Sequence, residues 1–197
     1  ALGAAPLMRY RVCSLSSFDL CALAAEYECI PADRRLHAPE KVKPIRMAAE
    51  LVLRALLSEH TGAPAESFRF LRTPRGKPYA ENAPYFNLSH SGDWLLCAVS
   101  DTPVGADIET PRTVSPNLLR RTCTPAELAY IGDDAQRFLE VWTAKEAYLK
   151  LLGTGLRIDL RKIETIHTAQ SPLQNLHSLR ERTEEYVFTI VCEENAE

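Results

Sequence analysis

The sequence predicts an α+β protein built from two halves with a similar order of elements. Segments with apolar residues every three or four positions, typical of helices, alternate along the chain with short apolar runs typical of strands. The 197 residues are enough for one large domain or two small ones with a sizeable core. A hairpin expected near residues 101–104 divides the chain into an N-terminal subdomain, 1–102, and a C-terminal subdomain, 103–197.

The composition is that of an ordinary globular protein. Hydrophobic residues make up 46% and charged residues 25%, and uncharged apolar runs such as Trp94–Val99 are far too short to cross a bilayer. The net charge of −3 argues against a general attraction to nucleic acid or membranes. The six cysteines form no Cys-x-x-Cys pair, and residues 1–6 lack the basic start of an export signal. We therefore expect a cytoplasmic protein with buried, reduced thiols.

Elements of the first half follow from periodicity and turn residues. A helix is expected over 44–60, because apolar residues recur at helical spacing, Pro44 suits a first turn and Gly62 ends the helix. A strand at 68–71 is followed by a loop at 74–78. Two further strands are expected at 86–90 and 95–100, with a turn at 91–93 between them.

The second half begins with a strand over 104–109. Thr124 and Glu127 have the spacing of a capping box, which predicts a helix start. A longer helix begins near Asp134 and ends at Gly153 and Gly155. Closing strands are expected at 157–163 and 186–192.

Two carboxylates on the strand 104–109 are candidate metal ligands. Side chains alternate along a strand, so Asp107 and Glu109 lie on one face, where they repel each other unless a cation lies between them. Oxygen-only ligands favour Mg²⁺ or Mn²⁺. The same pattern also occurs on ordinary solvent-facing strands.

The helix after Asp134 adds a second pair. Glu146 and Lys150 are four residues apart and share a face, which Trp142 one turn earlier partly covers. The pair is either an ordinary surface ion pair or a carboxylate able to bind metal or abstract a proton.

Basic residues are concentrated in the first third of the chain. Residues 31–77 contain ten Lys and Arg against five acids, a local net charge of +5. Within this block, the Gly-containing loop 72–79 has three basic side chains that suit a phosphate. His90 is either a phosphate donor, a general base or a structural histidine. The block is either an anion site or a set of solvated helix faces.

Four motifs occur together in one order. They are Gly-Lys-Pro at 76–78, Phe-Asn-Leu-Ser-His-Ser at 86–91, Gly-x-Asp-x-Glu at 105–109 and Trp-x-x-Lys-Glu-x-x-x-Lys at 142–150. Their combination resembles the 4′-phosphopantetheinyl transferases, specifically the longer surfactin-type group. The resemblance implies two similar α/β subdomains related by a pseudo-twofold, with the active site in the cleft between them. It also implies a monomer that transfers the phosphopantetheine arm of coenzyme A to a serine of an apo acyl or peptidyl carrier protein, releasing 3′,5′-ADP.

The resemblance also implies roles for individual residues. Asp107, Glu109 and Glu146 would bind Mg²⁺ or Mn²⁺, with Glu146 also the base. Lys150 would stabilise the pyrophosphate, and His90 would donate to it. The implied binding residues for coenzyme A, the co-substrate, are Arg34, Arg35, Arg46, Arg72, Arg75, Gly76, Lys77, Pro78, Asn87, Ser89, His90, Asp107 and Lys150. Arg34 or Arg35 would meet the 3′-phosphate. Relatives usually have a basic residue at the position of Pro44 or Ile45, where Lys43 or Arg46 can substitute.

Two other readings stay open. A metal-dependent phosphodiesterase or nuclease also uses paired acids and a lysine, but the net acidic charge fits a nucleic-acid substrate poorly. A non-catalytic carrier-binding domain of the same fold is the other, although the presence of all three carboxylates and Lys150 argues against it.

Overall fold

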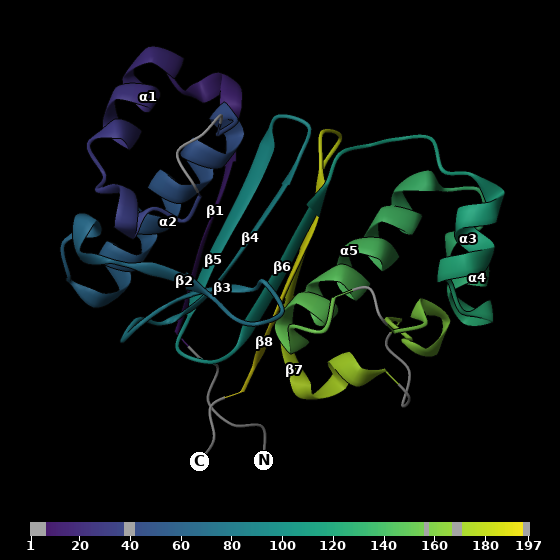
Figure 1. Ribbon diagram of the computed structural model, residues 1–197. Coiled ribbons are helices and arrows are strands. Elements are labelled where there is room, and N and C mark those ends of the chain that lie inside the picture. The colour runs from purple at the N-terminus through teal and green to yellow at the C-terminus, as the bar shows by residue number, and fades with distance from the viewer. Residues whose placement is uncertain (1–6, 38–41, 156–157, 167–170, 195–197) are drawn as a thin grey trace.

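The computed structural model describes residues 7–37, 42–155, 158–166 and 171–194. It shows an α+β fold with two three-stranded antiparallel sheets, which confirms the predicted class. The strands lie together in the centre of the molecule and the helices cover them from both sides (Figure 1). Among the described residues, no helix is both long and apolar enough to span a bilayer.

The first sheet belongs to the N-terminal half. Its strand order is β1 (Met8–Ser14), β5 (Trp94–Ser100) and β4 (Tyr85–Ser91). Helices α1 (Leu20–Glu28) and α2 (Pro44–Thr61) cover this sheet on one side (Figure 1). A separate two-stranded sheet consists of β2 (Phe70–Arg72) and β3 (Pro78–Ala80).

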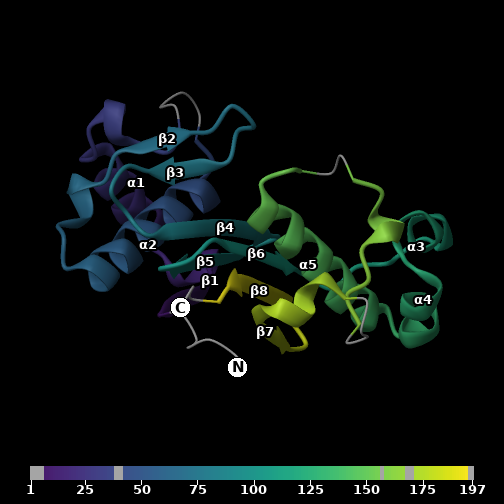
Figure 2. The same ribbon diagram turned by 90° about the horizontal axis from the view of Figure 1, so that it is seen from below.

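The second sheet belongs to the C-terminal half. Its strand order is β6 (Val104–Glu109), β8 (Val187–Glu193) and β7 (Leu176–Arg182). Helix α5 (Ala135–Leu152) packs on β6 and β8, and α3 (Pro116–Thr122) and α4 (Pro125–Ile131) lie beyond it (Figures 1 and 2). In both sheets the first strand of the half pairs with the last, and the last pairs with the middle one. The two halves therefore share one topology.

Helices α2 and α5 confirm their predicted positions. Each has 18 residues and ends at a glycine in the left-handed region, Gly62 with φ 76° and Gly153 with φ 63°. Leu53 and Leu57 of α2 are fully buried against the first sheet. The capping box of Thr124 and Glu127 is also present, at the start of α4.

Close packing joins α5 to β6. A Cβ atom added to Gly105 would lie 2.0 Å from the carbonyl oxygen of Ala147, so no larger residue fits there without a backbone shift. Strands β4 and β6 also lie side by side across the boundary between the sheets, and Leu96 of β5 shares a buried cluster with Ile108 of β6. The two sheets consequently form a continuous central layer.

Several predictions for the elements were wrong. The segment expected as a strand at 157–163 forms a 3₁₀ turn at Leu160–Lys162, where Leu160 and Ile163 pack against Leu149; Arg157 lies outside the described residues. The turn at 101–103 is not a hairpin, because β5 and β6 belong to different sheets. Pro78, expected in a loop, begins β3. No sequence signal predicted β1, α1, β3, α3 or β7.

All six cysteines are free thiols, as expected. The expectation that they are all buried was wrong for Cys21 and Cys29, which are exposed on and beside α1, and Cys13 is half-buried.

Candidate active site

Strands β4 and β6 place three pairs of polar groups beside each other. Ser89 Oγ donates to Asp107 Oδ1 at 2.8 Å, and Ser91 Oγ donates to Glu109 Oε2 at 3.0 Å. On the same two strands, the amide of Ala106 donates to Asn87 Oδ1 at 3.1 Å. Asn87, predicted to bind coenzyme A, therefore joins the two strands in this structure.

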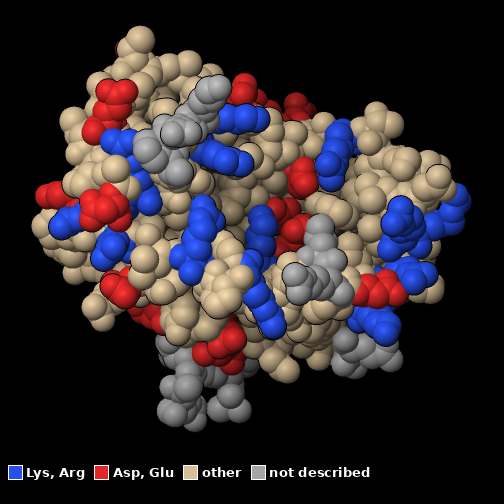
Figure 3. Space-filling model, in the orientation of Figure 1, with Lys and Arg blue, Asp and Glu red and all other residues tan. Residues whose placement is uncertain are grey.

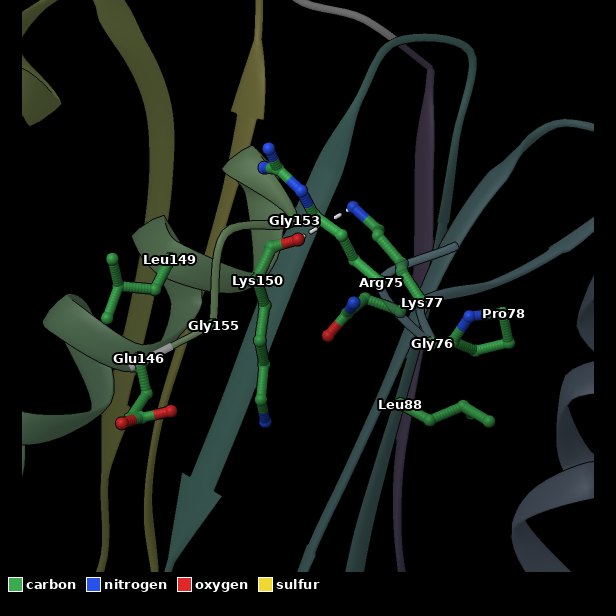
Figure 4. Close-up of a pocket in the computed structure, with 11 residues that line it drawn as sticks. Arg75, Gly76, Lys77, Pro78, Leu88, Glu146, Leu149, Lys150, Gly153 and Gly155 are labelled. Atoms are coloured by element: carbon green, nitrogen blue, oxygen red, sulfur yellow. Dashed lines mark hydrogen bonds between the residues drawn. The ribbon is translucent and has the colours of Figure 1, made fainter. Parts of the chain in front are cut away.

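Lys150 of α5 completes this cluster. Its Nζ lies 2.7 Å from Asp107 Oδ1 and 3.0 Å from Ser89 Oγ, and it donates to the carbonyl of Ala106 at 3.1 Å. Glu146, one turn earlier, extends beside Lys150 from the same face of the helix (Figure 4). The structure thus brings together Ser89, Asp107, Glu146 and Lys150, which the sequence analysis selected.

Burial shifts the pKa of two of the carboxylates. It raises the pKa of Asp107, although the Lys150 ammonium and the Ser89 hydroxyl oppose the shift. Burial also raises the pKa of Glu146, and the neighbouring Asp107 charge adds to this effect. One oxygen of each, Asp107 Oδ2 and Glu146 Oε1, is buried without a hydrogen-bond partner among the described residues. Such unpaired oxygens are costly unless another group satisfies them.

Glu109 is held differently. Its Oε1 accepts from Trp142 Nε1 at 3.0 Å and from the Arg112 guanidinium at 3.4 Å, while Ser91 donates to its other oxygen. Among the described side chains, no three His, Cys, Asp or Glu residues lie close enough together to form a metal centre. Asp107 and Glu146 nevertheless fit a hard divalent cation, because each has a buried carboxylate oxygen that lacks a partner.

A cavity of about 430 Å³ opens beside these residues. The loop that precedes β3 lies on one side of it and the end of α5 on the other (Figure 4). Its lining comprises Arg75, Gly76, Lys77, Pro78, Asn87, Leu88, Glu146, Leu149, Lys150, Gly153 and Gly155. Both halves of the chain therefore contribute to one cavity.

A second cavity of about 280 Å³ lies against β4. Its lining includes His37, Arg46, Arg72, Ser89 and His90. We refer to this second cavity as the basic cavity, because Arg46 and Arg72 line it. In the view of Figure 3, lysine and arginine side chains cluster near the middle of the molecule, next to acidic ones.

Positive charge in the basic cavity affects its two histidines. Burial, followed by the charges of Arg72 and Arg46, lowers the pKa of His37 to about 4. Burial and the charges of Arg46, Lys150 and Lys43 lower the pKa of His90. Both histidine side chains are therefore neutral near pH 7. The positive charges of Arg46 and Arg72, which lower these pKa values, also favour an anion in the cavity.

A buried ion pair fixes one wall of this cavity. Arg54 and Glu50 of α2 are almost fully buried and lie 3.0 Å apart. Arg54 donates to the carbonyl of Arg34 at 2.6 Å, and Glu50 accepts the amide of Leu36 at 3.0 Å. The backbone that leads to His37 is thereby held on α2.

Arg34 and Arg35 do not line either cavity. Arg34 donates to the carbonyl of Glu66 at 3.0 Å. Arg35 donates to the carbonyls of Ile30 and Glu28 and lies over the Tyr27 ring. Their contact with a 3′-phosphate stays a prediction.

Sequence reasoning missed three features of the site. His37 was not selected, because a lone histidine carries no spacing signal. Trp142 was noted as the first residue of a motif and as a cover of the helix face, but not as a donor to Glu109. Lys145, adjacent to Glu146, is fully buried with its Nζ 2.5 Å from Glu127 Oε2.

Comparison with known proteins agrees with this architecture. The model of the 4′-phosphopantetheinyl transferase superfamily matches residues 103–191, and that of the 4′-phosphopantetheinyl transferase N-terminal region matches residues 35–102. The chain is 33% identical over 119 residues to the 4′-phosphopantetheinyl transferase gsp of Aneurinibacillus migulanus, covering 58% of this chain and 50% of that protein. It is 35% identical over 121 residues to the transferase psf-1 of Bacillus pumilus, covering 58% and 52%.

A third relative matches over a longer stretch. The 4′-phosphopantetheinyl transferase HetI of Nostoc sp. is 34% identical over 169 residues, which is 79% of this chain and 69% of HetI. The alignments span about half the length of the gsp and psf-1 proteins. With both halves matched and a topology shared between them, the chain belongs to the 4′-phosphopantetheinyl transferase superfamily, in its surfactin-type group.

Proposed function

We propose that this protein transfers the 4′-phosphopantetheine group of coenzyme A to a serine of an apo acyl or peptidyl carrier protein, releasing 3′,5′-ADP. The observation that supports this most directly is the cluster of Ser89, Asp107 and Lys150 beside Glu146, at a cavity lined by both halves. The relatives bear the name of this activity. The subdomain boundary after residue 102 is part of the proposal, and the two family matches meet at that position.

The basic cavity would bind the phosphates of the nucleotide. Arg46 and Arg72 provide charge at its rim, and Ser89 and His90 provide hydrogen-bond donors beside them. Lys43 lies close enough to influence His90 and can compensate for the absent basic residue at Pro44. Charge-assisted hydrogen bonds to phosphate are stronger than neutral ones, so this cavity would supply most of the affinity.

Asp107 and Glu146 would hold a divalent cation, Mg²⁺ or Mn²⁺, and Glu109 would support it from its position against Trp142. The ion would supply charge neutralisation for the pyrophosphate during transfer. Lys150, which donates to Asp107 and Ser89, would also donate to the pyrophosphate as charge develops on the leaving group.

Glu146 would also accept the proton of the carrier serine. Burial raises its pKa, and a carboxylate with a raised pKa is a stronger base than an exposed one. The surface of the C-terminal half would position the carrier serine near the mouth of the cavity. We propose that the protein acts as a monomer, because the two halves with one topology together complete the site.

The test is direct transfer. The protein is incubated with coenzyme A, Mg²⁺ and an apo carrier, and the carrier is weighed by intact mass spectrometry. We expect the added mass of one phosphopantetheine arm, its loss with Lys150→Ala, and its retention with Lys162→Ala, an exposed lysine outside the site. No added mass on either acyl or peptidyl carriers, with coenzyme A bound, would point to a non-catalytic binding domain. Cleavage of nucleic acid instead would point to a nuclease.

A further inference from the structure

Lys77 crosses from one half of the protein to the other. It belongs to the loop before β3, yet its Nζ donates to the carbonyl of Lys150 at 2.7 Å (Figure 4). It also donates to the carbonyls of Leu151 at 3.2 Å and Val104 at 3.4 Å. An ammonium group has three protons to donate, and three backbone carbonyls of the C-terminal half accept them. The Lys77 ammonium therefore has its donors engaged before any ligand binds.

Two of these carbonyls lie in the last turn of α5, where helical hydrogen bonds run out. The amides of Gly153 and Thr154 turn back to the carbonyls of Leu149 and Lys150. Lys77 adds a charged donor to the same turn, and a cation at the C-terminus of a helix also interacts favourably with the helix dipole. Lys77 consequently acts as a capping group supplied by the other half of the chain.

Packing around Lys77 is close. A Cβ atom at Gly153 would lie 3.5 Å from Lys77 Cδ, so the alkyl chain of Lys77 rests on the glycine that ends α5. Next to Val104, Gly105 brings β6 against the backbone of Ala147. Burial also lowers the pKa of Lys77. These contacts fix the position of α5 relative to β6 and to the loop before β3.

The elements that meet at Lys77 are the ones that the site uses. The loop contributes Arg75 and Gly76 to the main cavity, and Pro78, the first residue of β3, lines both cavities. Helix α5 contributes Glu146 and Lys150. We propose that Lys77 is a positioning residue, not a phosphate ligand: its ammonium holds the end of α5 on the loop before β3 and so places Glu146 and Lys150. This inference rests on the proposed function for its kinetic consequence only.

The experiment compares Lys77→Met, Lys77→Arg and the matched control Arg75→Met, which changes a basic residue of the same loop and cavity. Hydrogen exchange of the Gly153 and Thr154 amides is measured without ligand, by NMR or mass spectrometry. Lys77→Met should speed this exchange on the order of tenfold, the effect of losing a charged hydrogen bond, and Lys77→Arg should restore most of the protection. Arg75→Met should leave the exchange rates of these two amides unchanged.

Steady-state transfer kinetics provide the second readout. A displaced α5 should lower kcat of Lys77→Met on the order of tenfold, while KM for coenzyme A changes less than about threefold, because Arg46, Arg72 and His90 remain. A phosphate ligand would behave in the opposite way, with KM raised and kcat kept. That pattern, or unchanged exchange at Gly153 and Thr154 in Lys77→Met, would overturn the inference.

The two proposals can fail separately. If the wild-type protein transfers no arm, the proposed function fails, but the exchange measurement on the ligand-free protein still decides whether Lys77 holds α5. If Lys77→Met does not fold, Lys77→Gln, whose uncharged amide has two N–H donors, replaces it in both measurements. If the wild type transfers the arm while amide exchange and kcat are unaltered in the Lys77 variants, the proposed function holds. The positioning role of Lys77 is then rejected.

Discussion

Ser89 on β4 and Asp107 on β6 share a hydrogen bond of 2.8 Å across the boundary between the two sheets. The same Asp107 oxygen receives Lys150 from α5, so three elements from both halves meet at one carboxylate. The other oxygen of Asp107 stays buried and unpartnered among the described residues. A site of this kind exists only when the two halves are packed together, and each contact can be tested by a separate substitution.

Glu146→Gln should lose transfer activity on the order of 10²–10⁴-fold, the range typical of general acid–base catalysis. The amide keeps the shape of the side chain but removes its charge and its basicity. Transfer rate is measured against Mg²⁺ concentration, together with the affinity for coenzyme A. The affinity should change much less than the rate, because the basic cavity is intact.

Glu184→Gln, at an exposed position, is the control for Glu146→Gln and should keep full activity. Recovery of Glu146→Gln to near the wild-type rate at high Mg²⁺ would show that Glu146 only binds the ion. A large loss of coenzyme A affinity in this variant would instead place Glu146 in ligand binding.

The pH dependence of stability should change in His37→Asn. The pKa of His37 is about 4 in the folded protein and about 6.5 when unperturbed. Between these values the unfolded chain binds the proton and the folded protein does not, so the free energy of unfolding falls as the pH falls from about 6.5 to about 4. Above pH 6.5 His37 is neutral in both states, so its protonation no longer lowers the free energy of unfolding.

Urea denaturation at a series of pH values measures this effect as the difference between wild type and His37→Asn. The variant should lose less stability on acidification across that interval. Parallel pH profiles for the two proteins would mean that His37 titrates in the fold as it does in the unfolded chain.

The long helices and the central strands were predictable because their signals are local. In α2, apolar spacing, Pro44 and Gly62 all point to one helix. Strand β7 lacked such a signal, since among the described strands it pairs with β8 alone, at an edge of its sheet, and many of its side chains are exposed. The segment near Leu160 has a strand-like apolar pattern because it packs under α5, not because it pairs with a sheet.

The site was predictable in residue type but not in contacts. The spacing of Asp107 and Glu109 placed both on one strand face, yet Trp142 and Ser91 hold Glu109 while Lys150 holds Asp107. Lys77 contacts residues that are 73 and 74 positions away in the chain. Local periodicity contains no information on pairs so far apart.

Gly105→Ala should destabilise the protein by about 3 kcal/mol or more, at the upper end of the cost of overpacking a core. The added Cβ would meet the Ala147 carbonyl at 2.0 Å, a backbone atom that cannot rotate away. Gly62→Ala is the control: apart from its chain neighbours, no atom of the described residues lies within 4 Å of its Cβ position. The left-handed φ of 76° costs stability, about 1–2 kcal/mol. Equal losses in urea denaturation would contradict the close packing of β6 on α5.

Lys145→Met should lower the free energy of unfolding by about 3–5 kcal/mol, the cost of removing one partner of a buried ion pair. Lys145 and Glu127 are fully buried, and Lys145 also donates to the carbonyls of Thr122 at 2.6 Å and Leu160 at 2.8 Å. Without the lysine, Glu127 has no cation beside it, and its partners among the described residues are the amide of Thr124 and the amide and hydroxyl of Thr165.

Urea denaturation with Lys162→Met as the matched control measures the cost, since Lys162 is exposed and its removal should change stability by less than about 0.5 kcal/mol. Adding Glu127→Gln to Lys145→Met should recover part of the loss, because the double variant leaves no uncompensated buried charge. Simple additivity of the two single losses would show that the ammonium and the carboxylate stabilise the fold independently. A double variant that is more stable than additivity predicts would assign the stabilisation to the ion pair. Through Lys145, the residue before Glu146, this pair joins α5 to α3, α4 and the 3₁₀ turn.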